Sequence, residues 1–401
     1  MHTDDGDRAV LAVMVFAVLF GQVALYPGVP ELVAALGATT ALDASTWFLA
    51  AEFAGFVLFA GVWGALSDAT GSRSPLVLAG ALGGAASYAT LIGLAGLGGL
   101  EFVTVLALRF IEGSLTVGAF SLSITMLMDL EGGHGRNMGA AGIAIGTGTA
   151  LGAPLGGRLT AVGPLVPLAV AAGLLVVVAL LATRVGDRAP TRERRGGLRA
   201  ALAGLAARPA LGLPYAFGFV DRFTAGFFAL VGTLYFRQAF GLDAATTGVV
   251  LALFFAPFAL LQYPMGALSD RIGRLVPVVG GSVCYGASTV AVSLAPTVEL
   301  AGAAMVALGV SGALVAPATM ALVSDVASGA ERGVAMGGFN VFGSLGFLAG
   351  VAGGGALAGS LGFGAAFLAA GALEAGIVLL ALPALLRLDV PRGPFEAGRS
   401  V

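Results

Sequence analysis

The sequence predicts an all-α membrane protein with twelve transmembrane helices in two pseudo-symmetric bundles of six. Three observations lead to this class. Of 401 residues, 58% are hydrophobic and only 10% are charged, whereas soluble domains carry roughly 25% charged residues. The apolar residues form long uninterrupted runs. A charged turn between two of these runs occurs a second time in the other half of the chain.

Twelve segments are long and apolar enough to cross a bilayer, which takes about 20 residues in a helix. They lack the alternating polarity of the strands in a membrane β-barrel. Because they are apolar on all sides, we expect them to be helices. The segments are 9–27, 47–66, 75–97, 102–126, 138–158, 162–183, 211–236, 246–266, 276–295, 299–323, 334–358 and 362–386.

The distribution of arginine predicts which side of the membrane each loop faces. Cytoplasmic loops carry an excess of basic residues. If the N-terminus is inside, 16 of the 20 basic residues fall in cytoplasmic segments, whereas Arg158 and Arg237 fall outside. The remaining two, Arg109 and Arg222, lie within helices. We therefore expect a multi-pass protein of the plasma membrane, surrounded by the lipid bilayer, with both termini in the cytoplasm.

The repeated turn divides the chain into two similar halves. Its first copy contains Gly64, Asp68, Gly71 and Arg73, and its second copy contains Gly266, Asp270, Arg271, Gly273 and Arg274. Another repeated pair brackets a later loop in each half: Asp129 and Arg136 in the first, Asp325 and Arg332 in the second. We expect an N-terminal bundle at 1–184, a cytoplasmic linker at 185–209 and a C-terminal bundle at 210–401. The linker has the pattern of an amphipathic helix at Leu198, Leu202 and Leu205.

The two turns have the residue types of a conformational latch. Glycine permits a tight turn. A carboxylate can accept from the amides at a helix N-terminus, and arginine pairs with carboxylates. The alternative is a simple basic loop that sets the orientation in the membrane.

Charged residues inside the apolar segments are the candidates for coupling to protons. An Arg at mid-helix costs about 2.5–3.5 kcal/mol on insertion scales and usually faces a wet cavity or a partner. Arg109 and Glu112 are three residues apart, so they share one helix face. The other candidates are Asp221 and Arg222 in the seventh segment and Glu52 in the second, and Glu374 is a further carboxylate in the twelfth. Each of these residues could equally form a structural ion pair.

Aromatic and amide side chains near a central cavity would shape a site for a small molecule. The candidates for this role are Gln22, Tyr26, Phe223, Phe227, Gln262 and Tyr263. The chain has a single cysteine, Cys284, and two histidines, which are too few for a metal site or a catalytic triad. It has no phosphate-binding Walker loop, which argues against ATP-driven pumping. We expect no cofactor, no metal, no nucleic acid partner and no enzyme activity.

The two sets of six segments, the repeated turn and the long middle loop resemble the major facilitator superfamily. The loop signature of that family runs roughly Gly-x-Leu-x-Asp-Arg-x-Gly-Arg-Arg, and the stretch from Gly266 to Arg274 fits it well. The first copy departs from it, because Ala69 and Ser72 stand where cations are expected. The resemblance implies a monomeric secondary carrier whose halves rock about a central cavity.

Arg109, Glu112 and Gly113 are similar to a second signature of the family, with Glu112 in place of the commoner Gln. The fifth segment looks like the family's antiporter signature, in which Gly and Pro bend the helix. The matching residues are Gly148, Gly152, Pro154, Gly156 and Gly157. The register is imperfect because Ala153 separates Gly152 from Pro154. The stretch from Tyr26 to Glu31 also resembles the drug:proton antiporter branch.

By this resemblance, we expect the export of a small, partly apolar organic molecule in exchange for protons. A proton-coupled importer or a uniporter of a metabolite is the alternative within the same class. A receptor or scaffold that transports nothing is the alternative from another class. A membrane enzyme would need a reactive cluster that the sequence does not offer.

Overall fold

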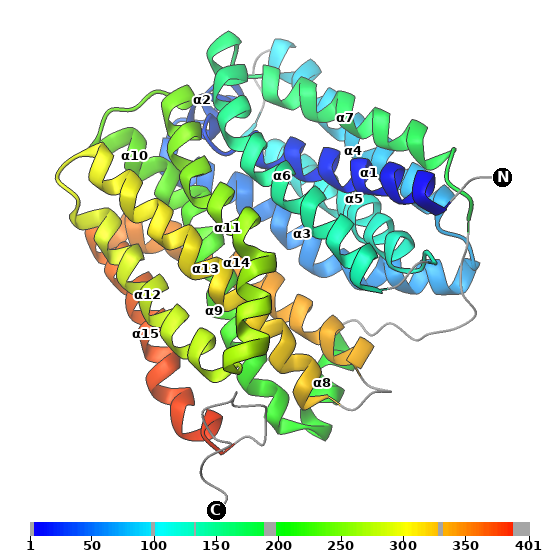
Figure 1. The fold of residues 1–401 in the computed structure, drawn as a ribbon. Helices are drawn as coiled ribbons and strands as arrows, with labels where there is room; N and C mark the ends of the chain where they lie inside the picture. Colours follow the sequence, from blue (N-terminus) through cyan, green and yellow to red (C-terminus); the bar gives the residue numbers. More distant parts are fainter. Residues whose placement is uncertain (1–3, 98–100, 132–133, 188–197, 328–331, 388–401) are drawn as a thin grey trace, which may run out of the picture. The chain divides into compact units, whose positions relative to one another are not determined.

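The structure is a computed structural model that describes the chain except residues 1–3, 98–100, 132–133, 188–197, 328–331 and 388–401 (Figure 1). The described residues form helices and connecting turns, without strands. Ten of the described helices are long and apolar enough to cross a membrane, and Val166–Ala182 is a shorter apolar helix. All twelve expected segments fall on helices. The predicted class, an all-α membrane protein, is therefore confirmed.

The packing of the chain forms two compact units, and the first contains residues 1–195 together with Thr233–Ala252. Its helices are α1 (Asp4–Val23), α2 (Val29–Ala35), α3 (Ala41–Thr70), α4 (Ser74–Leu97), α5 (Phe102–Met128), α6 (His134–Val162), α7 (Val166–Ala182), α10 (Thr233–Ala239) and the start of α11 (Ala244–Ile272). The expected first segment, 9–27, is shorter as a helix, because α1 ends at Val23 and turns lead into α2.

The second unit contains Gly196–Gly232 and Leu253–Val401. Its elements are α8 (Leu198–Ala207), η1 (Pro209–Leu211), α9 (Gly212–Phe227), η2 (Phe228–Gly232), the rest of α11, α12 (Leu275–Leu294), α13 (Val298–Val326), α14 (Arg332–Leu361) and α15 (Phe363–Leu385). The expected seventh segment, 211–236, is thus interrupted by one π-helical turn, η2. The chain crosses between the units there and again within α11. The division of the sequence into bundles at 1–184 and 210–401 remains a prediction.

Rows of small residues let neighbouring helices pack backbone to backbone in the first unit. Along α6, a Cβ added at Gly148 or Gly152 would lie 3.0 Å from the carbonyl oxygen of Phe16 or Phe20 of α1, respectively. A Cβ at Gly156 would overlap the carbonyl oxygen of Ala24. Residues four apart share a helix face, so these three glycines form one groove that holds α1 at backbone distance.

The second unit repeats this arrangement between α14 and α9. A Cβ added at Gly346 would overlap the carbonyl oxygen of Phe219, and one at Gly350 would overlap that of Phe223. The other face of α6 has a further contact inside the first unit. There, a Cβ at Gly157 would overlap the carbonyl oxygen of Ala244 at the start of α11.

The linker helix α8 packs within the second unit. Leu205 contacts a core cluster that includes Leu211, Tyr215 and Phe339. Leu202 on the same helix is 48% exposed, and the side chain of Leu198 lies outside the described residues. The amphipathic helix expected in the linker is therefore present, with Leu205 partly buried against protein.

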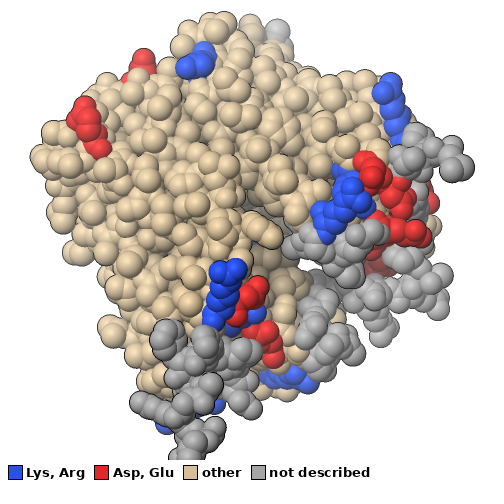
Figure 2. Space-filling view, viewed as in Figure 1, with Lys and Arg blue, Asp and Glu red and all other residues tan. Residues whose placement is uncertain are grey.

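The surface has the character that a lipid environment requires. The face drawn in Figure 2 is mostly uncharged, and its charged side chains gather at a few places. Large apolar side chains such as Leu58, Leu260 and Leu380 are 63%, 76% and 82% exposed. Extended apolar surface of this kind is unfavourable in water and favourable in a bilayer.

Replacing Gly156 with alanine should destabilise the protein by about 1–3 kcal/mol, because the added methyl group overpacks the contact with the backbone of Ala24, the residue after α1. Gly142 in the same helix is the matched control, since nothing lies within 4 Å of a Cβ built there. Gly142→Ala should be neutral or stabilising by up to about 1 kcal/mol, because alanine favours the helix. Thermal unfolding in detergent compares the two variants. Equal melting temperatures would contradict this view of α6.

Candidate functional site

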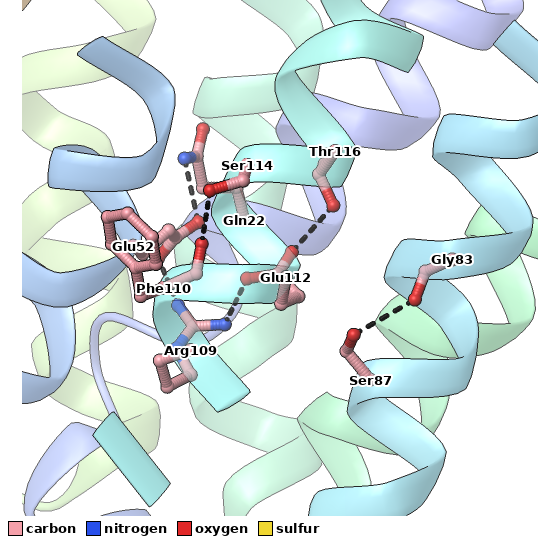
Figure 3. Close-up of polar contacts among 9 residues, drawn as sticks. All are labelled: Gln22, Glu52, Gly83, Ser87, Arg109, Phe110, Glu112, Ser114 and Thr116. Carbon is pink, nitrogen blue, oxygen red and sulfur yellow. Dashed lines mark hydrogen bonds and ion pairs between the residues drawn. The ribbon is translucent and has the colours of Figure 1, made fainter. Parts of the chain in front are cut away.

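Three charged side chains meet in the interior of the first unit. Glu52 comes from α3, whereas Arg109 and Glu112 come from α5. All three are at most 1% exposed. Arg109 forms ion pairs with both carboxylates, and its Nη1 lies 2.6 Å from Oε2 of Glu112 (Figure 3). We call Glu52, Arg109 and Glu112 the buried triad.

Close helix packing brings the buried triad together. A Cβ added at Gly113 would overlap the carbonyl oxygen of Glu52, and one at Gly55 would lie 2.5 Å from the carbonyl oxygen of Phe110. The absence of side chains at both positions therefore lets α3 and α5 approach at the level of the triad. Without this approach, Arg109 would have only Glu112, its neighbour on the same helix face.

Each carboxylate oxygen of the buried triad accepts a hydrogen bond. The amide of Gln22 in α1 donates to Oε1 of Glu52 at 2.9 Å, and the hydroxyl of Thr116 donates to Oε1 of Glu112 at 2.7 Å (Figure 3). Arg109 supplies a bond to the other oxygen of each carboxylate. Gln22, expected to line a substrate site, holds a carboxylate of the buried triad in place.

The buried triad carries one more negative than positive charge when both carboxylates are ionised. The guanidinium of Arg109 also lies over the ring of Phe48 at 4.3 Å and that of Tyr88 at 5.5 Å from the centroids. Its Nε atom is buried without a partner among the described residues. A buried excess charge is costly unless a proton or a cation neutralises it. The triad therefore has the chemistry of a site that binds and releases a positive charge.

Asp221 and Arg222 take up different environments in the second unit. Asp221 is 8% exposed. Arg222 points elsewhere: its Nη2 donates to Oδ1 of Asn340 in α14 at 3.1 Å, and its guanidinium lies 5.7 Å from the ring centroid of Phe339. Adjacent residues on a helix point about 100° apart, which explains why the two side chains separate.

The charged turns form the same kind of contact in each unit. In the first, Arg73 pairs with Asp129 and donates to Oγ of Ser67 at 3.2 Å. In the second, Arg274 donates to Oδ2 of Asp325 at 3.0 Å. It also donates to Oδ1 of Asp270 at 2.5 Å and to Oγ of Ser269 at 3.1 Å. Partial burial acts to lower the pKa of Arg274, but these carboxylates outweigh it and the pKa is raised.

The other expected latch residues differ in their exposure and contacts. Gly71 and Gly273 end α3 and α11 with φ values of 64° and 85°, a conformation that favours glycine. Gly64 and Gly266 are half-buried, whereas Asp68 and Arg271 are exposed. Arg136 is 60% exposed and lies 3.1 Å from Asp5. Arg332 begins α14, and its side chain lies outside the described residues.

The remaining expected substrate residues differ in how exposed they are. Tyr26 is 3% exposed. Phe227 is buried within an aromatic cluster, with ring centroids 5.6 Å from Phe228 and 4.9 Å from Phe367. Phe223 and Gln262 are half-buried, and Tyr263 is 88% exposed. Pro154, expected as part of a hinge, lies inside α6, which continues through it.

An ion pair within the first unit joins residues distant in the sequence. Glu31 of α2 pairs with Arg237 of α10, 206 residues away. Asp243, between α10 and α11, accepts a hydrogen bond from the backbone N–H of Thr246 at 2.7 Å, which lowers its pKa below the ordinary value. The sequence indicated that Arg237 is one of two outer arginines, but it offered no signal for its partner.

The sequence offered little or no indication of two further contacts, those of Asp187 and Glu374. Asp187, at the start of the linker, accepts from the backbone N–H of Arg73 at 2.9 Å and from the hydroxyl of Ser72. Glu374 accepts from the hydroxyl of Thr224 at 2.9 Å. Glu374 had one signal, as a lone carboxylate in an apolar segment, whereas nothing in the sequence placed Asp187 at the charged turn.

Comparisons with known proteins agree with this architecture. A family profile described as the Major Facilitator Superfamily matches residues 11–236 and 215–400. A tetracycline resistance protein, class G, from Vibrio anguillarum is 27% identical over 318 residues, which cover 75% of this chain and 77% of that protein. The inner membrane transport protein YajR of Escherichia coli is 33% identical over 106 residues, covering 26% of this chain and 22% of YajR.

Solved structures of transporters have the same fold. The human organic anion transporter MFSD10 is 21% identical, with a TM-score of 0.67, and the match covers 95% of this chain and all of that one. A bacterial homolog of the human lysosomal transporter Spinster, in an inward-facing and occupied conformation, is 14% identical with a TM-score of 0.76. That match covers 96% of this chain and 99% of that one.

Replacing Arg109 with leucine should destabilise the protein by about 3–5 kcal/mol, because it leaves two buried carboxylates without their cation. A triple variant that adds Glu52→Gln and Glu112→Gln should recover much of this loss, since it removes the uncompensated charge. Unfolding of the purified variants in detergent measures both effects. If Arg109→Leu unfolds like the unmodified protein, the buried triad does not hold α3 and α5 together.

Proposed function

The chain belongs to the Major Facilitator Superfamily, and we propose that it exports small organic molecules in exchange for protons by alternating access. Family and fold establish a multi-pass membrane transporter of small molecules, not an enzyme. The proposal adds the direction, the coupling ion, the plasma membrane as the location and cytoplasmic termini. It also takes the monomer as the working unit, because one chain contains both bundles.

The observation that carries the proposal is the uncompensated charge of the buried triad. Two buried carboxylates share Arg109, and no other described cation forms an ion pair with either of them. Binding of one proton neutralises the excess negative charge, and release of that proton restores the charge. If the excess charge costs more free energy in one access state than in the other, proton binding changes the ratio of the two states. Transport is then coupled to protons. A difference of about 1.4 kcal/mol changes the ratio of the states tenfold.

Two further observations support the direction and the mechanism. The tetracycline resistance protein that resembles this chain over three quarters of its length favours export, because a transporter protects a cell by removing the compound. The ion pair between Glu31 and Arg237 joins two segments that the sequence places on the outer side. In the proposed cycle, this pair closes the outer access and breaks when the outer side opens.

Glu112→Gln and Glu52→Gln should each lower proton-coupled transport at least about tenfold, because glutamine cannot carry a proton between the two states. The measurement uses everted membrane vesicles with an acidified lumen, in which export appears as compound uptake and proton release. Tetracycline and other partly apolar organic compounds are the test substrates. Glu299→Gln is the matched control, since Glu299 is exposed at the start of α13 and should leave transport unchanged.

The same assay separates the alternatives. Faster uptake into intact cells under an inward proton gradient would contradict export and favour an importer. Variants of Glu52 and Glu112 that leave every flux unchanged would contradict proton coupling through the buried triad. The absence of flux for any compound would favour a receptor or scaffold.

A disulfide between cysteines introduced at Glu31 and Arg237 should block transport reversibly, because it fixes a contact that must open in each cycle. The variant is built with Cys284→Ser, since Cys284 is free and exposed. Transport is measured after oxidation and again after reduction, which should restore it. Full activity of the cross-linked protein would show that this ion pair does not gate the path.

A further inference from the structure

The second unit contains two buried carboxyl groups that face the same place. Asp221 of α9 is 8% exposed and Glu374 of α15 is 1% exposed. Oε1 of Glu374 accepts from the hydroxyl of Thr224 at 2.9 Å. Thr224 follows Asp221 by three residues, so the two lie on the same face of α9. The two carboxyl groups interact electrostatically, and each also interacts with Tyr285 of α12. We call Asp221 and Glu374 the carboxyl pair.

Tight packing holds Glu374 in this position. A Cβ added at Gly286 of α12 would lie 2.6 Å from the carbonyl oxygen of Gly371 and 3.0 Å from Cβ of Glu374. The backbones of α12 and α15 therefore approach closely beside this side chain. The side chain of Glu374 packs against α12 and accepts a hydrogen bond from Thr224 of α9. It is therefore buried between these helices.

The carboxyl pair lacks the cation that the buried triad has. Oδ1 of Asp221 is buried without a hydrogen-bond partner among the described residues. Arg222 follows Asp221 in the chain, but its described contacts are with Asn340 and Phe339. Arg109, in contrast, bonds directly to both carboxylates of the triad. A buried carboxylate oxygen without a partner, close to a second carboxyl group, is stabilised by a hydrogen-bond donor or a positive charge.

The ionisable groups around the carboxyl pair are few. Arg222 is the neighbour on α9, and Tyr285 faces the pair from α12. The carboxylates of α13, Glu299 and Asp325, lie near its two ends. The sequence of α14 has one ionisable residue, Arg332, at its start, and that of α15 has only Glu374.

We propose that Asp221 and Glu374 share a bound proton, which makes the second unit a proton site in its own right. The proton sits on one carboxyl group, whose O–H donates to an oxygen of the other. This bond satisfies the unpartnered oxygen of Asp221 and removes one of two buried negative charges. Release returns the proton to water and leaves both groups ionised. The role of this site in transport rests on the proposed function, which it deepens by giving each half of the protein its own proton site.

Infrared difference spectroscopy of the purified full chain between acidic and alkaline pH tests the proposal. A protonated carboxyl group absorbs separately from a carboxylate, so its loss as the pH rises is observed directly. The double variant Asp221→Asn with Glu374→Gln should lose the signal of the pair. Glu374→Gln alone should change the midpoint of the remaining Asp221 signal by about one pH unit, because interacting groups titrate together. Glu52→Gln should leave the signal of the pair in place.

A second measurement needs no variant, which protects the test from failures of folding. Dicyclohexylcarbodiimide reacts with protonated carboxyl groups in apolar surroundings, and mass spectrometry of the labelled peptides locates the product. The label should appear on Asp221 or Glu374 at acidic pH and decrease as the pH rises.

An unchanged difference spectrum in the double variant, or the absence of label on both residues at acidic pH, would overturn the proposal. If the pH midpoint of the Asp221 signal in the Glu374→Gln variant equals that of the wild-type protein, the two groups do not share a proton. These readouts are independent of transport. If vesicles show no proton-coupled flux while the signal of the pair persists, the proposed function fails and the proton site stands.

Discussion

The ion pairs of Arg109 are the interaction on which the first unit depends. A guanidinium buried in a membrane protein is tolerated only when charged and polar groups surround it. Here one carboxylate comes from the same helix and the other, Glu52, comes from α3. The requirement to bury this charge with its partners therefore fixes the distance between α3 and α5. Gly55 and Gly113 make that distance possible because they leave room for the opposing backbone.

Glycine has a related role throughout the molecule. In a bilayer, helices gain little from burying apolar side chains against each other, since lipid is equally apolar, and close backbone packing contributes instead. The rows on α6 and α14 contact α1 and α9 in corresponding ways, through Gly152 and Gly156 in one unit and Gly346 and Gly350 in the other. The repeat is therefore a repeat of helix packing as well as of charged loops.

The two halves share this packing but differ in how they treat their charges. In the first, arginine and carboxylates form a connected group with every carboxylate oxygen bonded. In the second, Arg222 interacts with Asn340 and Phe339. The neighbours of the carboxyl pair there are the hydroxyl of Thr224 and the phenol of Tyr285. A duplicated architecture can thus provide two chemically different sites, because these side chains differ between the halves while the rows of glycine that position the helices correspond.

Only some of these features could be read in the chain itself. The apolar runs, the repeated turn and the pairing of Arg109 with Glu112 were predictable, because they depend on composition and on neighbours three or four residues apart. The partners Glu52, Gln22 and Asp187 were not, because they reach their sites from other helices and loops.

The sequence by itself determined that the chain is a helical, duplicated membrane protein with charges inside its spans. The tertiary structure alone decided which partners these charges find on other helices. It joined Arg109 to Glu52, Arg237 to Glu31 and Glu374 to Thr224. The physical reason is that helix length and side-chain periodicity are local properties, whereas ion pairs between helices depend on where backbones can approach, and that is settled only when all the helices pack together.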